Sequence, residues 1–225
     1  MSATPDRPAP TLPGRERLPS GRHGLTREAV VASQRGRLIE AMAQVVTEKG
    51  YGPATVADVV ERAGVSRRTF YEQFADKEAC FLAVYSTGAE VLLTRIRQAV
   101  EPLPEAGWRA RARAGVETTL AVLAEEPDFA WATQIEILGA GPAALERRAA
   151  VLGVFAEMWR SLHARARQEE PDRVPELPAE VFTILTGGIE EVVRERLRTQ
   201  GAASLPGLAD PVLRAVLAIL GDRPA

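Results

Sequence analysis

The chain has 225 residues, of which 46% are hydrophobic, 26% are charged and 5% are aromatic, and its formal net charge is −2. A chain of this length buries roughly 70% or more of the surface that it exposes when unfolded, so it can form a sizeable core. Its one cysteine, Cys80, excludes an internal disulfide and a multi-cysteine metal site.

Charge and hydrophobicity are patterned in ways that narrow the fold class. Residues 1–77 hold twelve Lys and Arg against nine Asp and Glu, a net charge of +3, whereas residues 78–225 carry −5. A basic segment of this kind is a signature of nucleic-acid binding when it coincides with a suitable motif. Ala and Leu are abundant and no convincing alternating strand pattern occurs, so we expect an all-α protein.

Several other classes of protein are disfavoured. The N-terminus lacks the apolar core of a signal peptide, and no run approaches the roughly 18 apolar residues of a membrane helix, so we expect a cytoplasmic protein without a membrane partner. No GxSxG, P-loop, HExxH or dinucleotide fingerprint occurs, so we expect no enzyme, no catalytic residue and no cofactor. His23 and His163 are isolated, which argues against a metal site. Cys80, beside Phe81, is expected to be buried rather than a redox sensor.

The N-terminal arm comes first in the chain. Residues 1–25 carry five prolines and three glycines, so we expect this arm to be disordered in the free protein. Arg15, Arg17 and Arg22 lie just ahead of the first predicted helix, where a basic arm could follow a phosphate backbone or enter a minor groove. A merely solvated tail is the alternative.

The first predicted helix begins after Thr26, a plausible N-cap, and ends at Lys49 before Gly50. Its apolar stripe is typical of a helix that supports other helices on one face. Two arginines, Arg35 and Arg37, lie near its outer start. We expect one of them, Arg35, to contact a DNA phosphate.

Residues 55–77, TVADVVERAGVSRRTFYEQFADK, carry the most informative pattern of the chain. Thr55 can cap a short amphipathic helix, and Gly64 permits the sharp turn that follows it. Ser66 can cap a second helix, which places Phe70 and Phe74 one turn apart on its inner side. Two short helices joined by such a turn form a helix-turn-helix, although a purely structural helix pair is the common alternative.

The outward side chains of this second helix suit double-stranded DNA. An α-helix fits the major groove, where Arg pairs with guanine and the Thr methyl group contacts the methyl group of thymine. We therefore expect base contacts from Arg67, Arg68 and Thr69. The residues expected to contact phosphates are those at helix N-termini or beside the base-contacting face: Thr55, Ser66, Tyr71 and Lys77.

The segment GVSRRTFYEQFADKEA, preceded by VADVVERA, resembles the helix-turn-helix of the TetR family of transcriptional regulators. The resemblance covers roughly Arg27 to Tyr85, and Val60 is one departure, because many helix-turn-helix proteins have Ala there. It implies a homodimer on a near-palindromic operator, most often a repressor, with a small-molecule effector bound among the C-terminal helices.

Beyond the motif we expect Asp76 to cap a long helix from Lys77 to about Val100, which Pro102 and Pro104 end. Three helices follow, over Trp108–Ala124, Asp128–Leu138 and Ala143–Gln168, separated by turn signals. Large apolar side chains of these helices and the next could line a ligand pocket, although core packing is the default for any such set. The candidates are Trp131, Ile135, Phe155, Met158, Trp159 and Phe182.

Two apolar helices are expected at the end of the chain. Pro178 suits an early helical position, and Gly187-Gly188 inside the helix suggests close backbone approach or a bend. Asp210-Pro211 is typical of a helix start. These helices suit a four-helix dimer interface, although a monomer that buries both remains the alternative. The candidate interface residues are Phe182, Leu185, Ile189, Val193, Leu213, Val216, Leu217 and Leu220.

Together these observations predict an all-α protein with a DNA-binding domain over residues 26–76 and a helical regulatory and dimerisation domain over residues 77–225. The expected partners are a double-stranded DNA operator, a second copy of the chain and a small-molecule effector. The alternative is an all-α small-molecule-binding or scaffold protein whose helix-turn-helix is only structural.

Overall fold

A computed structural model describes residues 27–103 and 107–221. These ranges contain α-helices, two 3₁₀ helices and no strand, which confirms the predicted all-α class. The elements in chain order are α1 (Arg27–Lys49), α2 (Val56–Ala63), α3 (Arg67–Gln73), α4 (Lys77–Val100), α5 (Trp108–Glu125), α6 (Pro127–Gln134), η1 (Glu136–Gly139), α7 (Pro142–Glu169), α8 (Ala179–Gln200), η2 (Ala202–Leu208) and α9 (Ala209–Leu220).

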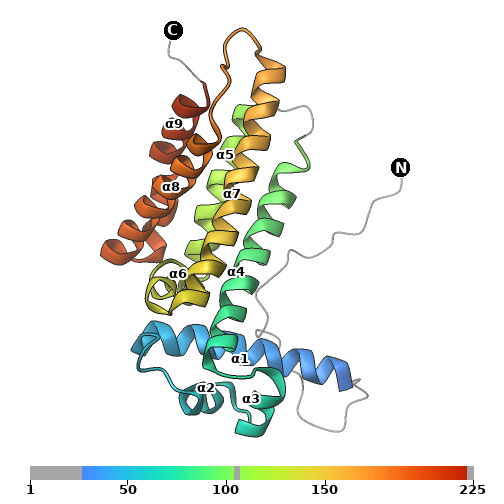
Figure 1. Cartoon of the computed structure of the whole chain (residues 1–225), viewed down its shortest axis with the longest axis vertical. Helices are drawn as coiled ribbons and strands as arrows, with labels where there is room; N and C mark the ends of the chain where they lie inside the picture. The colour runs from blue at the N-terminus through green and yellow to red at the C-terminus, as the bar shows by residue number, and fades with distance from the viewer. Residues whose placement is uncertain (1–26, 104–106, 222–225) are drawn as a thin grey trace.

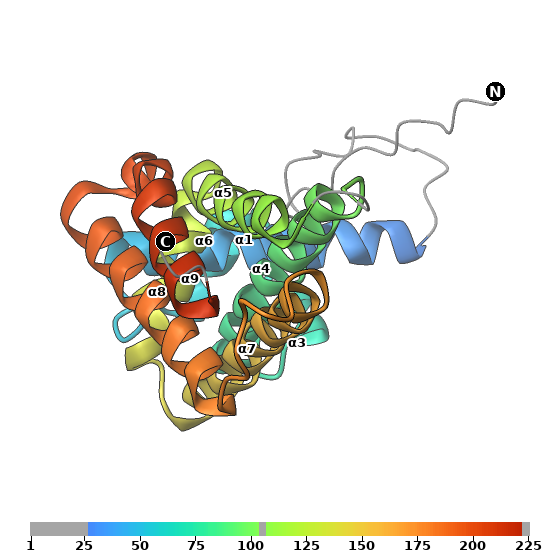
Figure 2. The same cartoon turned by 90° about the horizontal axis from the view of Figure 1, so that it is seen from above.

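Helices α4, α5 and α7 run along the long axis of the molecule, and α1 lies across it (Figure 1). Helices α1, α2 and α3 lie together at one end, and α4 runs from them beside α7 (Figure 1). Helices α8 and α9 lie on the side of the molecule away from α4, with α5 and α7 between them (Figures 1 and 2). Helix α4 therefore connects the helix-turn-helix to the larger helical part.

The short helices of the motif are fixed by their capping residues. Thr55 caps α2 in a full capping box, because its hydroxyl accepts from Asp58 N and the Asp58 carboxylate accepts from Thr55 N. Gly64 ends α2 with φ +63°, a left-handed conformation that favours glycine. Ser66 and Asp76 cap α3 and α4, as the sequence predicts.

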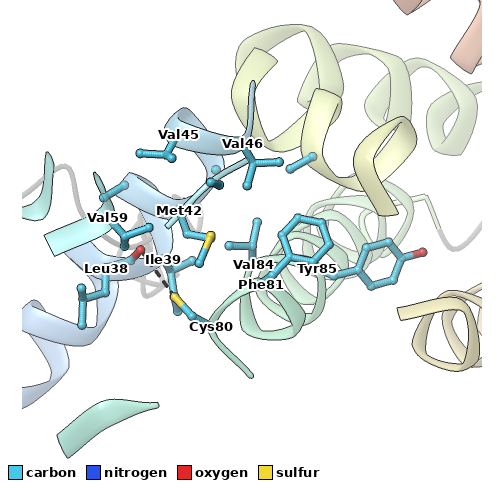
Figure 3. Packing of buried hydrophobic residues seen from close by; sticks show 14 of the residues in the cluster. Leu38, Ile39, Met42, Val45, Val46, Val59, Cys80, Phe81, Val84 and Tyr85 are labelled. Atoms are coloured by element: carbon cyan, nitrogen blue, oxygen red, sulfur yellow. Dashed lines mark hydrogen bonds between the residues drawn. The ribbon is translucent and has the colours of Figure 1, made fainter. Parts of the chain in front are cut away.

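One hydrophobic core joins the motif to the helices beyond it. Figure 3 shows side chains of α1 and α4 facing one another, with the Cys80 thiol donating to Leu38 O. Cys80 is fully buried, which confirms the packing role, and burial raises the pKa of its thiol to about 12. The same core includes Phe129 of α6 and Ile137 of η1.

A second core fills the larger helical part. Trp108 at the start of α5 is fully buried, and its indole N–H donates to Glu170 Oε1 beyond the end of α7. Arg109 pairs with the same carboxylate, whose pKa is lowered to about 2 by these bonds. The remaining members of this core come from α5 to α9, including η2.

Several helix boundaries differ from their predicted positions, and three of these differences are informative. The helix expected over Asp128–Leu138 ends at Gln134 and is followed by η1, where Leu138 N bonds three residues back to Ile135 O. Pro178 occupies the N-cap of α8 rather than its first turn. Helix α9 begins at Ala209 after η2, so Asp210 lies in its first turn and is not its N-cap.

Among the described residues, two segments are long and apolar enough to cross a membrane when judged by length and composition alone. They are Lys77–Val100 and Ala202–Leu220. The sequence analysis expected no run of this kind and did not identify these two. Each has one third of its most apolar window buried inside the chain, and core helices of water-soluble proteins meet the same criterion.

The predicted N-terminal arm lies outside the described residues.

Candidate DNA-binding surface and ligand cavity

The outer face of α3 presents a small group of polar side chains to solvent. Phe70 and Phe74 are buried in the first core, which leaves Arg67, Arg68 and Tyr71 exposed. The side chain of Arg68 is 89% exposed and pairs with Glu72 at 2.9 Å, whereas Arg67 makes no ion pair within residues 27–103 and 107–221. The structure thus brings these predicted DNA-contacting residues onto one surface.

The predicted residues at helix N-termini have their hydroxyls engaged within the motif. The Ser66 hydroxyl accepts from Thr69 N at 3.0 Å and lies 2.9 Å from the Thr69 hydroxyl. The Thr55 hydroxyl donates to Asp58 at 2.7 Å. Asp58 is also paired with Lys49, and these bonds lower the pKa of its carboxyl to about 2. Local hydrogen bonds thus position the side chains of Thr55, Asp58, Ser66 and Thr69.

Arg35 and Arg37 both connect α1 to the motif. Arg35 donates to Gln73 O at 3.0 Å and lies over the Phe74 ring at 4.3 Å, which fixes the end of α3. Arg37 donates to Ala63 O at 3.2 Å, at the end of α2. Arg35 is nonetheless exposed, so its predicted phosphate contact stays a prediction beside this structural contact.

Lys77 has a different geometry from the one that a phosphate contact requires. Its ammonium group donates to the carbonyl oxygens of Tyr51, Gly52 and Ala54 at 2.8, 3.2 and 3.0 Å. It also lies 4.3 Å from the centre of the Tyr51 ring. An ammonium group has three donors, and here all three have acceptors. The arrangement favours a structural role in the α1–α2 loop, and the phosphate contact stays a prediction.

Two adjoining cavities lie among α4, α5 and α7. The first, of about 100 Å³, extends to α6 and α8, and the second, of about 480 Å³, extends toward the first turn of α5. Thr119, Phe155 and Trp159 line both of them. The second volume is within the usual range for ligand pockets.

Four polar residues lie at the α6–α8 end of the first cavity. Glu190 accepts from Gln134 Nε2 and from Arg148, both at 3.2 Å, and its side chain is only 17% exposed. Gln134 Oε1 and Arg148 Nε are buried without a hydrogen-bond partner among the described residues. Tyr85 lines the same cavity, and burial raises the pKa of its phenol. Glu190 is therefore a partly buried residue of the cavity lining, although it carries a charge.

Only half of the predicted ligand-binding residues line these cavities. Phe155 and Trp159 line both, and Met158 lines the second. Trp131, Ile135 and Phe182 line neither, because they pack into the second core. Phe182 contacts the buried His163, whose Nε2 lies 3.0 Å from Pro175 O. Apolar character alone does not separate pocket residues from core residues, whereas the polar pocket residues gave no sequence signal.

The predicted dimer residues require a correction. Phe182, Leu185 and Val193 of α8 are buried against other helices of the same chain, as are Leu213, Val216 and Leu220 of α9. Ile189 and Leu217 are partly buried in the same core. The apolar stripe of each helix thus packs inward. The exposed large apolar side chains of these two helices are Ile184, Val192 and Ile219.

Glu136 connects the helix-turn-helix to the helices around the cavities. Its Oε2 accepts from Tyr51 N at 2.8 Å, and its Oε1 accepts from Trp131 Nε1 at 3.2 Å. The Thr47 hydroxyl adds a bond to Asp128 O at 3.3 Å. Helix α6, which lines the first cavity, is therefore bonded to the same α1–α2 loop that Lys77 holds.

Comparisons with known proteins agree with the helix-turn-helix geometry. Residues 38–84 match the sequence profile of the family described as bacterial regulatory proteins, tetR family. The HTH-type transcriptional activator FasR of Mycolicibacterium smegmatis is 31% identical over 102 residues, which cover 45% of this chain. The HTH-type regulator YvdT of Bacillus subtilis is 38% identical over 58 residues, or 26% of this chain. The matched stretches span 46% and 28% of these relatives, less than half of either.

Solved structures with the same fold extend over most of the chain. The fatty acid degradation regulator FadR of Bacillus halodurans has a TM-score of 0.73 at 22% identity, covering 82% of this chain and 94% of that one. FadR of Bacillus subtilis, solved in complex with stearoyl-CoA, has a TM-score of 0.69 at 20% identity, covering 81% and 97%. At these identities the likeness shows the fold alone.

Proposed function

We propose that this chain, whose residues 38–84 match the tetR family of bacterial regulatory proteins, is a sequence-specific DNA-binding transcriptional regulator. The observation that carries the proposal is the exposed face of α3, where the side chains of Arg67, Arg68 and Tyr71 extend into solvent. The helices of the motif are fixed by their capping residues. A rigid helix with outward Arg side chains is suited to base contacts in a major groove.

The proposed DNA-bound form is a homodimer on a near-palindromic operator, with the two α3 helices about 34–36 Å apart. We assign the dimer contact to the outer face of α8 and α9. Ile184 is 68% exposed there, and Val192 and Ile219 are also exposed. Gly187 and Gly188 lie on the same face, and an added Cβ at either would meet no atom of this chain within 4 Å. A second backbone could approach closely at these glycines.

The proposed mode of regulation is repression relieved by a small molecule. Docking on an operator is sufficient to block transcription, and a ligand shifts this equilibrium when its affinity differs between two states. The adjoining cavities, with Phe155 and Trp159 in both linings, support an elongated apolar ligand. FadR of Bacillus subtilis, with the same fold, was solved with stearoyl-CoA, which suggests the same general class. FasR is an HTH-type transcriptional activator, so a promoter-reporter assay must test whether this chain represses or activates transcription.

Selection of DNA fragments from a random pool tests the main proposal. A regulator of this kind should enrich one near-palindromic sequence whose half-sites are about one helical turn apart. Enrichment of a single asymmetric site would contradict the dimer. Failure to enrich any sequence would favour the alternative function, an all-α small-molecule-binding or scaffold protein.

A further inference from the structure

The second cavity has a basic end, toward the first turn of α5. Arg111 lines this end, and its Nε is buried without a hydrogen-bond partner among the described residues. A buried donor left without an acceptor destabilises the protein, and more so when the group is charged. Such a group in a native structure calls for a partner supplied from elsewhere.

The other charged groups in this lining have their own partners. Arg165 donates to Glu169 at 2.6 Å, and Glu157 accepts from Arg160 at 2.5 Å. Arg111 makes no ion pair within the described ranges, so its guanidinium is the one cation of this lining, within those ranges, that has no carboxylate to neutralise it. A planar guanidinium with parallel N–H donors matches a carboxylate or phosphate group.

The rest of the cavity lining is mostly apolar, which indicates that the part of the ligand beyond its anionic group is apolar. Ile96, Val100 and Leu162 surround the cavity beyond Arg111, and Phe155 and Trp159 continue its apolar wall into the first cavity. Leu123 of the first cavity lies twelve positions after Arg111 on α5, which corresponds to about 18 Å of helix. Val154, Glu157 and Ser161 are solvent-exposed and line the second cavity, so it opens to the surface along α7.

We infer that Arg111 binds the acidic head group of an elongated amphiphile whose apolar tail lies beneath Phe155 and Trp159. This rests on the proposed ligand-responsive function and adds the residue that selects the charge of the ligand. The shared chemistry is an anion on an aliphatic chain, which a fatty carboxylate or a chain-bearing phosphate would both supply.

Calorimetric titration with four ligands of equal chain length tests the inference. Dodecanoate and dodecyl phosphate should bind the full chain at least tenfold more tightly than dodecanol or dodecylamine below their micellar concentrations. The ratio between the two anions then identifies which head group fits. Equal affinity for dodecanoate and dodecanol would overturn the inference.

Two matched variants assign the selectivity to Arg111. Arg111→Met should reduce affinity for dodecanoate at least tenfold and leave dodecanol binding unchanged, because the aliphatic stem is kept while the charge is lost. Arg113→Met is the control, since Arg113 is two residues away on α5, pairs with Glu117, and does not line the cavity. Unaltered dodecanoate binding by Arg111→Met would overturn the assignment. Thermal melting confirms that each variant is folded.

The outcomes separate this inference from the proposed function on which it rests. If dodecanol and dodecanoate both bind and both release DNA, the ligand-responsive regulator stands and only the role of Arg111 is rejected. If none of the four compounds binds while sequence-selective DNA binding is intact, both the role of Arg111 and an apolar chain as effector are rejected.

Discussion

At the scale of single residues, two adjacent arginines of α3 differ in their surroundings. Arg68 is bridged to Glu72, whereas Arg67 extends from the first position of α3 without an ion pair in the described part of the chain. An exposed bridge of this type contributes little, about 0.3–0.5 kcal/mol, so it can exchange for a base contact at small cost. Both side chains are therefore available to DNA.

Replacing either arginine should weaken operator binding selectively. We expect Arg67→Ala and Arg68→Ala each to cost about 1–3 kcal/mol and to relax specificity at one operator position, because a base contact is lost. Gel-shift titration on the selected operator and its point variants measures both effects. Arg113→Ala, at an exposed α5 arginine paired with Glu117, is the control. An unaltered sequence preference in both α3 variants would reject the assignment.

Lys77 gives the clearest contrast between the sequence and the structure at this scale. Its position at the start of α4 suggests a phosphate contact, but its ammonium group bonds three carbonyl oxygens of the α1–α2 loop. We expect Lys77→Met to lower the free energy of unfolding by about 1.5–3 kcal/mol, because hydrogen bonds from a charged donor are lost. Urea unfolding measures this change.

A surface lysine provides the comparison for Lys77. Lys49→Met removes a solvent-exposed pair with Asp58 and should cost less than about 1 kcal/mol. If Lys77→Met instead left stability unaltered and reduced the salt dependence of DNA binding by one phosphate, the phosphate contact predicted from the sequence would be correct.

At the scale of elements, local signals predict helix starts well. The caps at Thr55, Ser66 and Asp76 depend on a few consecutive residues, and each is found as predicted. Helix η2 was missed because it is a 3₁₀ segment that contains Pro206, without the 3.6-residue period that marks an α-helix. Periodicity also shows that α8 has an apolar stripe without showing whether its own chain or another covers it.

Polar residues inside the pocket were the hardest to predict. Gln134 and Glu190 lie on separate helices, and only folding brings the amide and the carboxylate within 3.2 Å. A Glu in a helix is most often solvated, so the sequence alone favours the wrong interpretation. Arg111 is subject to the same limit, because the cavity that it lines forms only when α4, α5 and α7 pack together.

The α6–η1 segment carries a testable connection between the cavities and the motif. Glu136 uses one carboxylate oxygen for Tyr51 N and the other for Trp131 Nε1. Glu136→Gln has only one carbonyl oxygen, so one of these donors loses its acceptor. We expect the change in operator affinity on adding dodecanoate to shrink by about 0.5–2 kcal/mol, the size of a weakened coupling.

Paired gel-shift titrations with and without ligand measure the coupling in Glu136→Gln. Glu146→Gln, an exposed position in the first turns of α7, carries the same chemical change and should leave the coupling intact. Equal coupling in both variants, with ligand affinity retained, would show that Glu136 does not connect the two regions.

At the scale of the whole molecule, the proposed dimer face can be separated from the core. Ile184→Glu should convert the dimer to a folded monomer, because it places a charge in the proposed interface without entering the core of its own chain. Sedimentation velocity measures the change in mass, and circular dichroism checks the helix content. Leu145→Glu, at an exposed leucine of α7, is the control. A dimer that survives Ile184→Glu would place the interface elsewhere.

The shared first core has a consequence for how such proteins diversify. Its members come from α1 to α4 on one side and from α6, η1 and the start of α7, including Ala144, on the other. A cut after Lys77 would therefore expose apolar surface on both fragments. Phe129, Ile137 and Ala144 supply the apolar surface that packs against the helix-turn-helix. Recombination that joins this helix-turn-helix to another regulatory domain would succeed only if that domain supplied a matching apolar surface. The two halves are expected to be inherited, and to vary, as a matched pair.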